Sequence, residues 1–338
     1  MSVATEEKFL SKMVKNKPKK SSKELVSKMI EKGIDISPYS IEEVESYLLN
    51  SNNFFRVCSY RKNYQKYLNG VNKGKYINLS FDRLKALAIF DMKFRKSILG
   101  ICLDVEHSLK LYILKDFENS SDDGYLIIQD FFRTQNGDKA VKNIVQKSNK
   151  IYVSDLANKY IYPKETEHIY CTSDPENKEV NVDLPIWAML ELITFGDLLN
   201  FYYFYFNRMH KKPPIPNGVL HKVKNIRNAC AHNNCVLNQL YDDSANIPSV
   251  IGEFAKQLGL SKNSINKKLK CNAICEMMCT FCCLDKLASL PIRKHDYESF
   301  SSEIDSFFDK YYHLFEKDLL VKSYLDFIKQ TVDKLKQI

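Results

Sequence analysis

The stretch FDRLKALAIFDMKFRKSILGICLDVEHSLK, residues 81–110, decides the fold class of this sequence. Its apolar residues recur at every third or fourth position: Phe81, Leu84, Leu87, Phe90, Phe94, Ile98, Ile101, Val105 and Leu109. This spacing puts them on one face of a helix, because an α-helix has about 3.6 residues per turn. We therefore expect one long amphipathic helix that starts near Ser80.

Helical patterns continue on both sides of this stretch. Toward the N-terminus, residues 22–32 form a helical pattern that ends at Gly33, and Ser40 with Glu43 predicts a capping box at the start of another helix. Toward the C-terminus, residues 185–206 are apolar nearly all round, which predicts one buried helix that ends before KKPPIP. Further helices are expected within 218–240, 269–287 and 297–338, without a convincing strand series. The predicted class is all-α.

The chain divides into three expected regions. Residues 1–75 hold a lysine-rich basic arm and an N-terminal helical region, and residues 76–243 form the central core. The core is interrupted by an insert around 118–183, which is rich in Ser, Asp and Gly at its start and polar at its end. Residues 244–338 form a C-terminal helical region.

Composition limits the class of protein. The 338 residues are 44% hydrophobic with only ten Gly and ten Pro, which is typical of a globular chain. The net charge of +9 suits a polyanionic partner, although a plain solvated surface explains it equally well. The N-terminus has no apolar signal core, so the ten cysteines predict free thiols in a reducing cytoplasm. No membrane span is expected, because the longest apolar stretch contains Glu191, Asp197 and Asn200.

The segment NIRNACAHNNCVLN, residues 225–238, carries the candidate chemistry. Cleavage of RNA without a metal ion needs a base for the 2′-hydroxyl proton, an acid for the leaving oxygen and a cation for the phosphate. His232 titrates near neutral pH and Arg227 keeps its charge, so these two residue types suit those roles. Asn228 is expected to orient one of them by hydrogen bonding, and no cofactor or metal ion is required.

The spacing of this pair predicts a second copy of the chain. Residues five positions apart on a regular helix point about 140° away from each other. One helix therefore positions Arg227 and His232 poorly for a single reaction, whereas a symmetric homodimer would supply both groups to one cleft. Structural roles are the alternatives: His232 as a packing residue and Arg227 as a surface ion pair. Glu191 is either a partner that holds Arg227 or a hydrogen-bonded buried carboxylate.

Three stretches of the sequence resemble the Abi-like family of bacterial abortive-infection proteins, within the HEPN superfamily of α-helical ribonucleases. They are residues 81–110, with Phe90, Asp91, Arg95, Glu106 and Leu109; LPIWAMLELITFGDL, with Pro185, Trp187, Glu191, Phe195 and Gly196; and IRNACAHNNCVLN. The resemblance covers roughly residues 40 to 240. One departure is Asn233-Asn234-Cys235, where many members have a basic residue near an Asn.

The resemblance implies a fold and an activity. The fold is a HEPN-like four-helix core, to which this chain adds N- and C-terminal helices. The activity is metal-independent endoribonuclease cleavage at composite sites of a dimer, with Arg227 and His232 as catalytic residues and Asn228 as the polar residue after the Arg. The implied role is phage defence or toxin action, with RNA as substrate and a structured noncoding RNA as a further partner. A catalytically silent RNA-binding or interaction protein on the same scaffold is the alternative.

Two further groups of residues are candidate sites. Cys271, Cys275, Cys279, Cys282 and Cys283 rise along one predicted helix by about 6 Å at each four-residue step, which favours buried packing over a zinc site. Basic residues interleaved with tyrosines are candidates for RNA contact, although tyrosines at helical spacing are equally typical of a core. The candidates are Arg61, Lys62, Tyr64 and Lys66, together with Lys19 and Lys20 of the basic arm.

Overall fold

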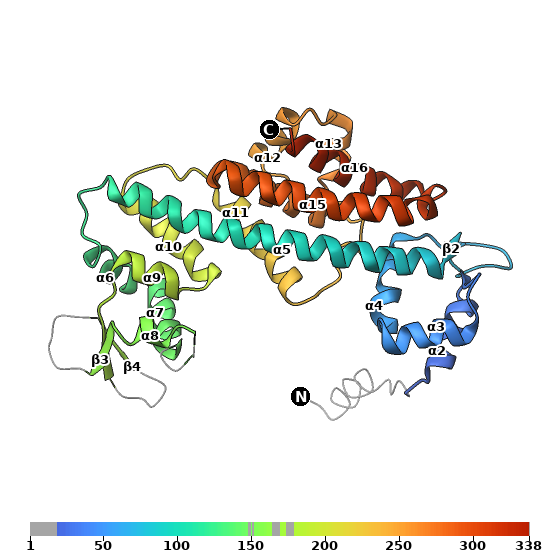
Figure 1. The fold of residues 1–338 in the computed structure, drawn as a ribbon, viewed down its shortest axis with the longest axis horizontal. Helices are drawn as coiled ribbons and strands as arrows, with labels where there is room; N and C mark the ends of the chain where they lie inside the picture. Colours follow the sequence, from blue (N-terminus) through green and yellow to red (C-terminus); the bar gives the residue numbers. More distant parts are fainter. Residues whose placement is uncertain (1–18, 148–149, 151, 164–169, 174–178, 338) are drawn as a thin grey trace, which may run out of the picture. The chain divides into compact units, whose positions relative to one another are not determined.

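A computed structural model describes residues 19–147, 150, 152–163, 170–173 and 179–337. The first part of the predicted basic arm, residues 1–18, lies outside this range. The chain forms two compact units, residues 1–89 and 90–338. Helices account for most of both, which confirms the all-α prediction (Figure 1). The predicted region boundaries at 75 and 243 and the HEPN-like identity of the core stay predictions.

The first unit is built from short helices with well-defined starts. Ser21 and Ser40 each cap a helix in a reciprocal capping box, with Glu24 and Glu43 as the respective partners, so the box predicted at Ser40 is confirmed. Ile34 pairs with Leu79 in a two-residue parallel bridge between β1 and β2. The elements are α2 (Ser22–Glu31), β1 (Ile34–Asp35), α3 (Ile41–Asn50), α4 (Phe54–Ser59), the 3₁₀ helix η1 (Tyr60–Asn63) and β2 (Leu79–Ser80).

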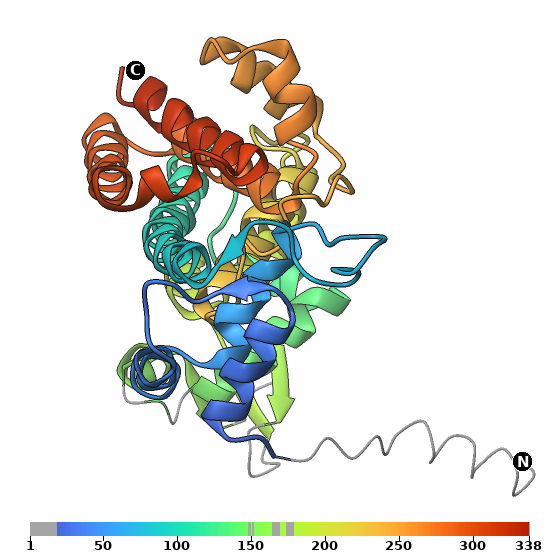
Figure 2. The same cartoon turned by 90° about the vertical axis from the view of Figure 1, so that its right-hand side faces the viewer.

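The predicted long helix is present as α5 (Phe81–Glu118), which begins in the first unit and continues through the second. Within the second unit, α15 (Leu290–Tyr311) lies alongside it, as Figures 1 and 2 show. The ring of Phe90 packs on Phe307 with centroids 4.6 Å apart, and Phe94 packs on Phe300 at 5.9 Å. The two helices are therefore antiparallel, since residue numbers rise along one as they fall along the other.

The apolar stretch 185–206 forms two helices, so the prediction of one continuous helix is wrong. α9 (Ile186–Leu192) is followed by Ile193, whose backbone is extended, and α10 (Phe195–Arg208) begins two residues after Ile193. Thr194 is the cause, because its hydroxyl accepts a hydrogen bond from the N–H of Asp197 at 3.2 Å and so caps a new helix.

The insert contains a small sheet that the sequence pattern did not predict. Its strands are antiparallel in the order β3-β5-β4. Gly124, just before the insert's first helix, lies against Trp187 of α9, because a Cβ added there would be 3.1 Å from the indole ring. Trp187 is half-exposed and also meets Tyr125 edge-on. The elements are α6 (Leu126–Phe132), α7 (Gln135–Lys147), α8 (Ser154–Ala157), β3 (Ile161–Pro163), β4 (Tyr170–Ser173) and β5 (Glu179–Val182).

The segment with the candidate chemistry forms α11 (Asn217–Ala231), which packs against α10 and α14 (Asn272–Leu287). The apolar side chains of α11 at Val219, Leu220, Val223 and Ile226 are buried there. The cysteines at 271, 275, 279, 282 and 283 are buried too, which confirms the predicted packing role. The chain ends with α12 (Ser249–Gln257), α13 (Lys262–Lys268), α15, η2 (Tyr312–Phe315) and α16 (Leu319–Leu335). In the described part of the chain, no helix has both the length and the apolar character to cross a bilayer.

Candidate active site

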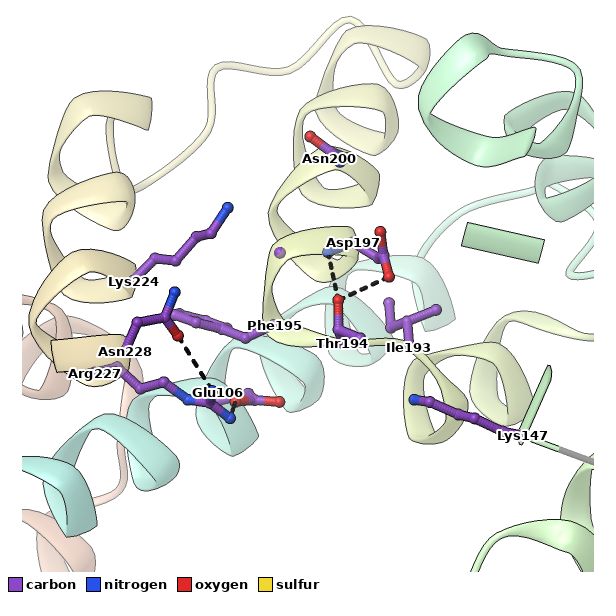
Figure 3. Close-up of a pocket in the computed structure, with 11 residues that line it drawn as sticks. Glu106, Lys147, Ile193, Thr194, Phe195, Asp197, Asn200, Lys224, Arg227 and Asn228 are labelled. Atoms are coloured by element: carbon purple, nitrogen blue, oxygen red, sulfur yellow. Dashed lines mark hydrogen bonds and ion pairs between the residues drawn. The ribbon is translucent and has the colours of Figure 1, made fainter. Parts of the chain in front are cut away.

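A pocket of about 610 Å³ lies at the junction of α9 and α10 (Figure 3). Its volume falls in the range of about 300–1,000 Å³ that is usual for small-molecule sites. All of its lining belongs to the second unit. It is lined by Glu106 of α5, Lys147 of α7, residues 193–197 and Asn200 at the start of α10, and Lys224, Arg227 and Asn228 of α11. Two of the predicted site residues, Arg227 and Asn228, therefore lie in one pocket.

Arg227 is held at the pocket wall by two side chains. Its Nη2 lies 3.9 Å from Oε2 of Glu106, and its Nη1 donates to Oδ1 of Asn228 at 3.3 Å. Figure 3 shows the guanidinium reaching from α11 toward the carboxylate on α5. Burial raises the pKa of the Glu106 carboxyl above its usual value, while the charges of Lys110 and Arg227 oppose that rise. The carboxylate orients a guanidinium that still faces the pocket.

The opposite wall carries a second cation and a second carboxylate. Lys147 is half-buried and its ammonium donates to the carbonyl oxygen of Leu192; burial lowers its pKa from the usual value. Asp197 is buried, and its Oδ2 accepts hydrogen bonds from the Thr194 hydroxyl at 2.7 Å and from Asn143 at 3.3 Å. Asp197 is thereby occupied in capping α10, and the pocket lining holds three basic side chains against two acidic ones.

His232 lies at the end of α11 and is exposed; it is not part of the pocket lining. The helix ends at Ala231 with His232 as its C-cap, so the two candidate catalytic residues do not share a regular helix. The turn is a Schellman motif, in which the N–H of Asn233 donates to Cys230 and that of Asn234 to Ala229. Asn233 has a φ of +57°, the left-handed conformation that this motif requires.

The polypeptide after His232 is fixed to α5. Oδ1 of Asp91 accepts the main-chain N–H groups of Val236 at 3.0 Å and Leu237 at 2.9 Å. Arg95 donates to Oδ2 of Asp91 at 2.7 Å and also to the side-chain oxygen of Asn233. Asp91 and Arg95 are both buried, so an internal ion pair sets the position of the turn that carries the histidine.

Glu191 does not pair with Arg227. It is exposed on α9 and lies 3.8 Å from the ammonium of Lys110, so the partner of Arg227 is Glu106 instead. Helix periodicity describes contacts within one helix. It could not tell whether Glu106 or Glu191 pairs with Arg227, because each of these pairs would join two different helices.

The predicted RNA-contact residues all belong to the first unit. Lys19, Lys20 and Lys62 are exposed, whereas Arg61 and Tyr64 are half-buried. Lys66 is exposed and its ammonium lies 4.7 Å from the ring centre of Tyr76. Tyr60, from the same stretch, is fully buried and serves the core of that unit.

Sequence reasoning missed Lys147, Lys224 and Thr194, although Thr194 lies three residues before Asp197, which is a recognisable cap pattern. An isolated lysine leaves no comparable signal. Among the described residues, no group of three or more His, Cys, Asp or Glu side chains is placed to hold a metal ion.

A family model described as Abi-like protein matches residues 47–238, which is more than half of the chain. The chain belongs to the Abi-like protein family. The matched segment of this Abi-like protein runs from α3 to the turn after α11 and contains every residue that lines the pocket, together with Asp91, Arg95 and His232. No curated protein and no solved structure matches the chain.

Proposed function

We propose that this Abi-like protein is a metal-independent endoribonuclease of the HEPN type, acting in bacterial phage defence by abortive infection or as a toxin. One observation carries the proposal: Arg227 and Asn228 lie together in an open, cation-rich pocket where a carboxylate orients the guanidinium. Arg227 can grip two non-bridging oxygens of a phosphate in its planar fork. Membership of the abortive-infection family supports the cellular role.

The chemistry needs two proton transfers around that phosphate. A base takes the proton of the RNA 2′-hydroxyl, and the 2′-oxygen attacks the adjacent phosphorus. An acid gives a proton to the departing 5′-oxygen, so the products end in a 2′,3′-cyclic phosphate and a 5′-hydroxyl. Arg227 stabilises the charge that grows on the phosphoryl oxygens, and His232 serves as acid or base.

The position of His232 supports a composite site in a homodimer. Within one chain, Arg227 lines the pocket and His232 lies outside the lining on an exposed turn. A second copy that presents its own turn to the pocket would bring both groups to one phosphate. A structured noncoding RNA is a further proposed partner, because a basic protein of net charge +9 suits such a polyanion.

The same position favours a second candidate function. If no copy brings His232 to the pocket, the protein is a non-catalytic RNA-binding or interaction protein whose pocket holds phosphate without cutting the chain. In that case a specific RNA copurifies with the protein and stays intact.

The test is cleavage of mixed RNA in EDTA by the wild type and by Arg227→Ala and His232→Ala. His221→Ala is a matched control, since His221 is exposed on the same helix and does not line the pocket. The two site variants are expected to lose cleavage while the control keeps it, and the products should carry cyclic phosphate ends. Cleavage that survives both site substitutions, or 5′-phosphate ends, refutes the assignment.

A mixing experiment tests the composite site. Co-expressed Arg227→Ala and His232→Ala chains form mixed dimers that retain one arginine and one histidine, so part of the activity should return. Activity by a strictly monomeric protein at low concentration contradicts the dimer.

A further inference from the structure

Lys224 faces the same pocket as Arg227. It precedes Arg227 by three residues on α11, and residues at that spacing lie on one face of a helix. Its side chain is half-buried and lines the pocket wall opposite Lys147 (Figure 3). α11 therefore presents two cations to one cavity.

The other charged groups of the pocket have partners within the part of the chain that the structure describes. Arg227 is beside Glu106, Lys147 donates to the carbonyl of Leu192, and Asp197 caps α10. Among the described residues, the ammonium of Lys224 has neither a hydrogen bond nor an ion-pair partner within the contact distances that define these. An unpaired positive charge at the wall of a cavity attracts anions. The pocket can therefore bind more negative charge than Arg227 alone neutralises.

The start of α10 leaves room for this ammonium. A Cβ added at Gly196 would lie 3.3 Å from Nζ of Lys224, a tight contact, and 3.6 Å from its Cε, an ordinary one, so the lysine would have to shift by a few tenths of an ångström. The absence of a side chain at this position lets the lysine lie against the first turn of α10. Thr194 accepts the N–H of Asp197 in that turn, and the Asp197 carboxylate accepts the Thr194 hydroxyl, so neither of these two groups is a partner for Lys224.

We propose that Lys224 binds a second phosphate of the RNA, adjacent to the phosphate held by Arg227. This inference rests on the proposed function and refines its substrate: the site takes a single-stranded segment with at least two consecutive phosphodiesters. A free nucleotide or inorganic phosphate offers the same chemistry from another source, and the experiment separates these sources.

The experiment measures binding without cleavage. A 2′-O-methyl oligonucleotide keeps every phosphate but has no 2′-hydroxyl to attack, and its affinity is read by fluorescence anisotropy. Lys224→Ala is expected to lower the affinity about tenfold, the size of one charge-assisted hydrogen bond. The slope of log affinity against log salt should fall by about 0.7, as expected for one lost phosphate contact on a single strand.

Two variants isolate the role of the pocket. Lys224→Arg keeps the charge and should keep most of the affinity. Lys212→Ala removes the same charge from an exposed residue of the segment before α11 that does not line the pocket, and it should leave the affinity within about twofold. Thermal melting of each variant checks that the fold is retained.

Three results overturn the proposal. The first is an equal affinity of wild type and Lys224→Ala for the oligonucleotide. The second is a loss of affinity in Lys212→Ala as large as that in Lys224→Ala. The third is that a 5′-mononucleotide or inorganic phosphate binds as tightly as the oligonucleotide and depends on Lys224 to the same extent. The readout is independent of catalysis. If wild type cuts no RNA but the Lys224 effect persists, the nuclease proposal fails and the phosphate subsite stands.

Discussion

Asp91 accepts a hydrogen bond from Nε of Arg95 at 2.7 Å, one turn further along α5, and both side chains are buried. The other oxygen of Asp91 accepts the main-chain N–H groups of Val236 and Leu237. The turn that carries His232 is thus positioned by the ion pair of Asp91 and Arg95. Removing either residue would leave the other charge buried without its ion-pair partner.

Asp91→Ala should lower the free energy of unfolding by about 3–5 kcal/mol, because it leaves Arg95 buried without its partner and two N–H groups without an acceptor. Urea denaturation measures this change. Lys96→Ala, an exposed position on the same helix, is the control and should change the value by less than about 0.5 kcal/mol. A loss below about 1 kcal/mol in Asp91→Ala contradicts the bracing role.

Asn233→Val should be about 1–2 kcal/mol less stable than Asn233→Asp. Both replacements change the side chain, but aspartate tolerates the positive φ and still accepts from Arg95, whereas a β-branched residue does neither. The comparison uses the midpoints of chemical unfolding. If the two variants unfold alike, the Schellman turn does not depend on the conformation of this residue.

Glu106→Gln should slow RNA cleavage by roughly 10- to 100-fold, because Arg227 loses the charge that orients it. Affinity for the 2′-O-methyl oligonucleotide should rise rather than fall, since the pocket loses a negative charge. Single-turnover rates and anisotropy measure the two effects separately. Glu118→Gln, exposed at the end of α5, serves as the control. Parallel losses of rate and affinity would assign Glu106 to binding instead.

Asp296→Asn should stabilise the protein at pH 7.5 by on the order of 2 kcal/mol. Burial and the neighbouring Asp104 raise the pKa of Asp296 to about 6, while His295 opposes the rise. Its Oδ2 is buried with no hydrogen-bond partner among the described residues. The folded protein binds the extra proton, so the contribution of Asp296 to stability is complete below pH 4 and is lost as the pH rises through 6.

Unfolding measured at several pH values tests that sign. Wild type should lose stability between about pH 4 and 7 relative to Asp296→Asn. Exposed Asp309→Asn should follow the wild-type profile. If the stability of Asp296→Asn changes with pH as that of wild type does, the pKa of Asp296 is not raised in the folded protein.

Local sequence signals predicted the elements of the fold because they act within one or two turns. The capping box at Ser40 and the apolar face that starts at Phe81 each depend on residues a few positions apart. The break at Thr194 was missed because the apolar pattern continues across it. The hydroxyl of Thr194 caps a new helix despite that pattern, and the three-residue spacing of Thr194 and Asp197 predicts such a cap.

The pocket could be predicted only in part. Arg227 and Asn228 stand out from their own segment, but Glu106 reaches Arg227 only after α5 and α11 pack together. Lys147 and Lys224 come from different helices and have no distinctive neighbours in the sequence. The exclusion of His232 from the lining depends on where α11 ends, which the position of the Schellman turn decides.

The break between α9 and α10 has a practical consequence. The chain contains one tryptophan, Trp187, and it lies half-exposed on the helix that ends at the pocket. Indole emission from this protein therefore reports on a single place, because the chain has no second tryptophan. A change in how the start of α9 packs against Gly124 and Tyr125 can be followed by intrinsic fluorescence, without attaching a dye to the chain.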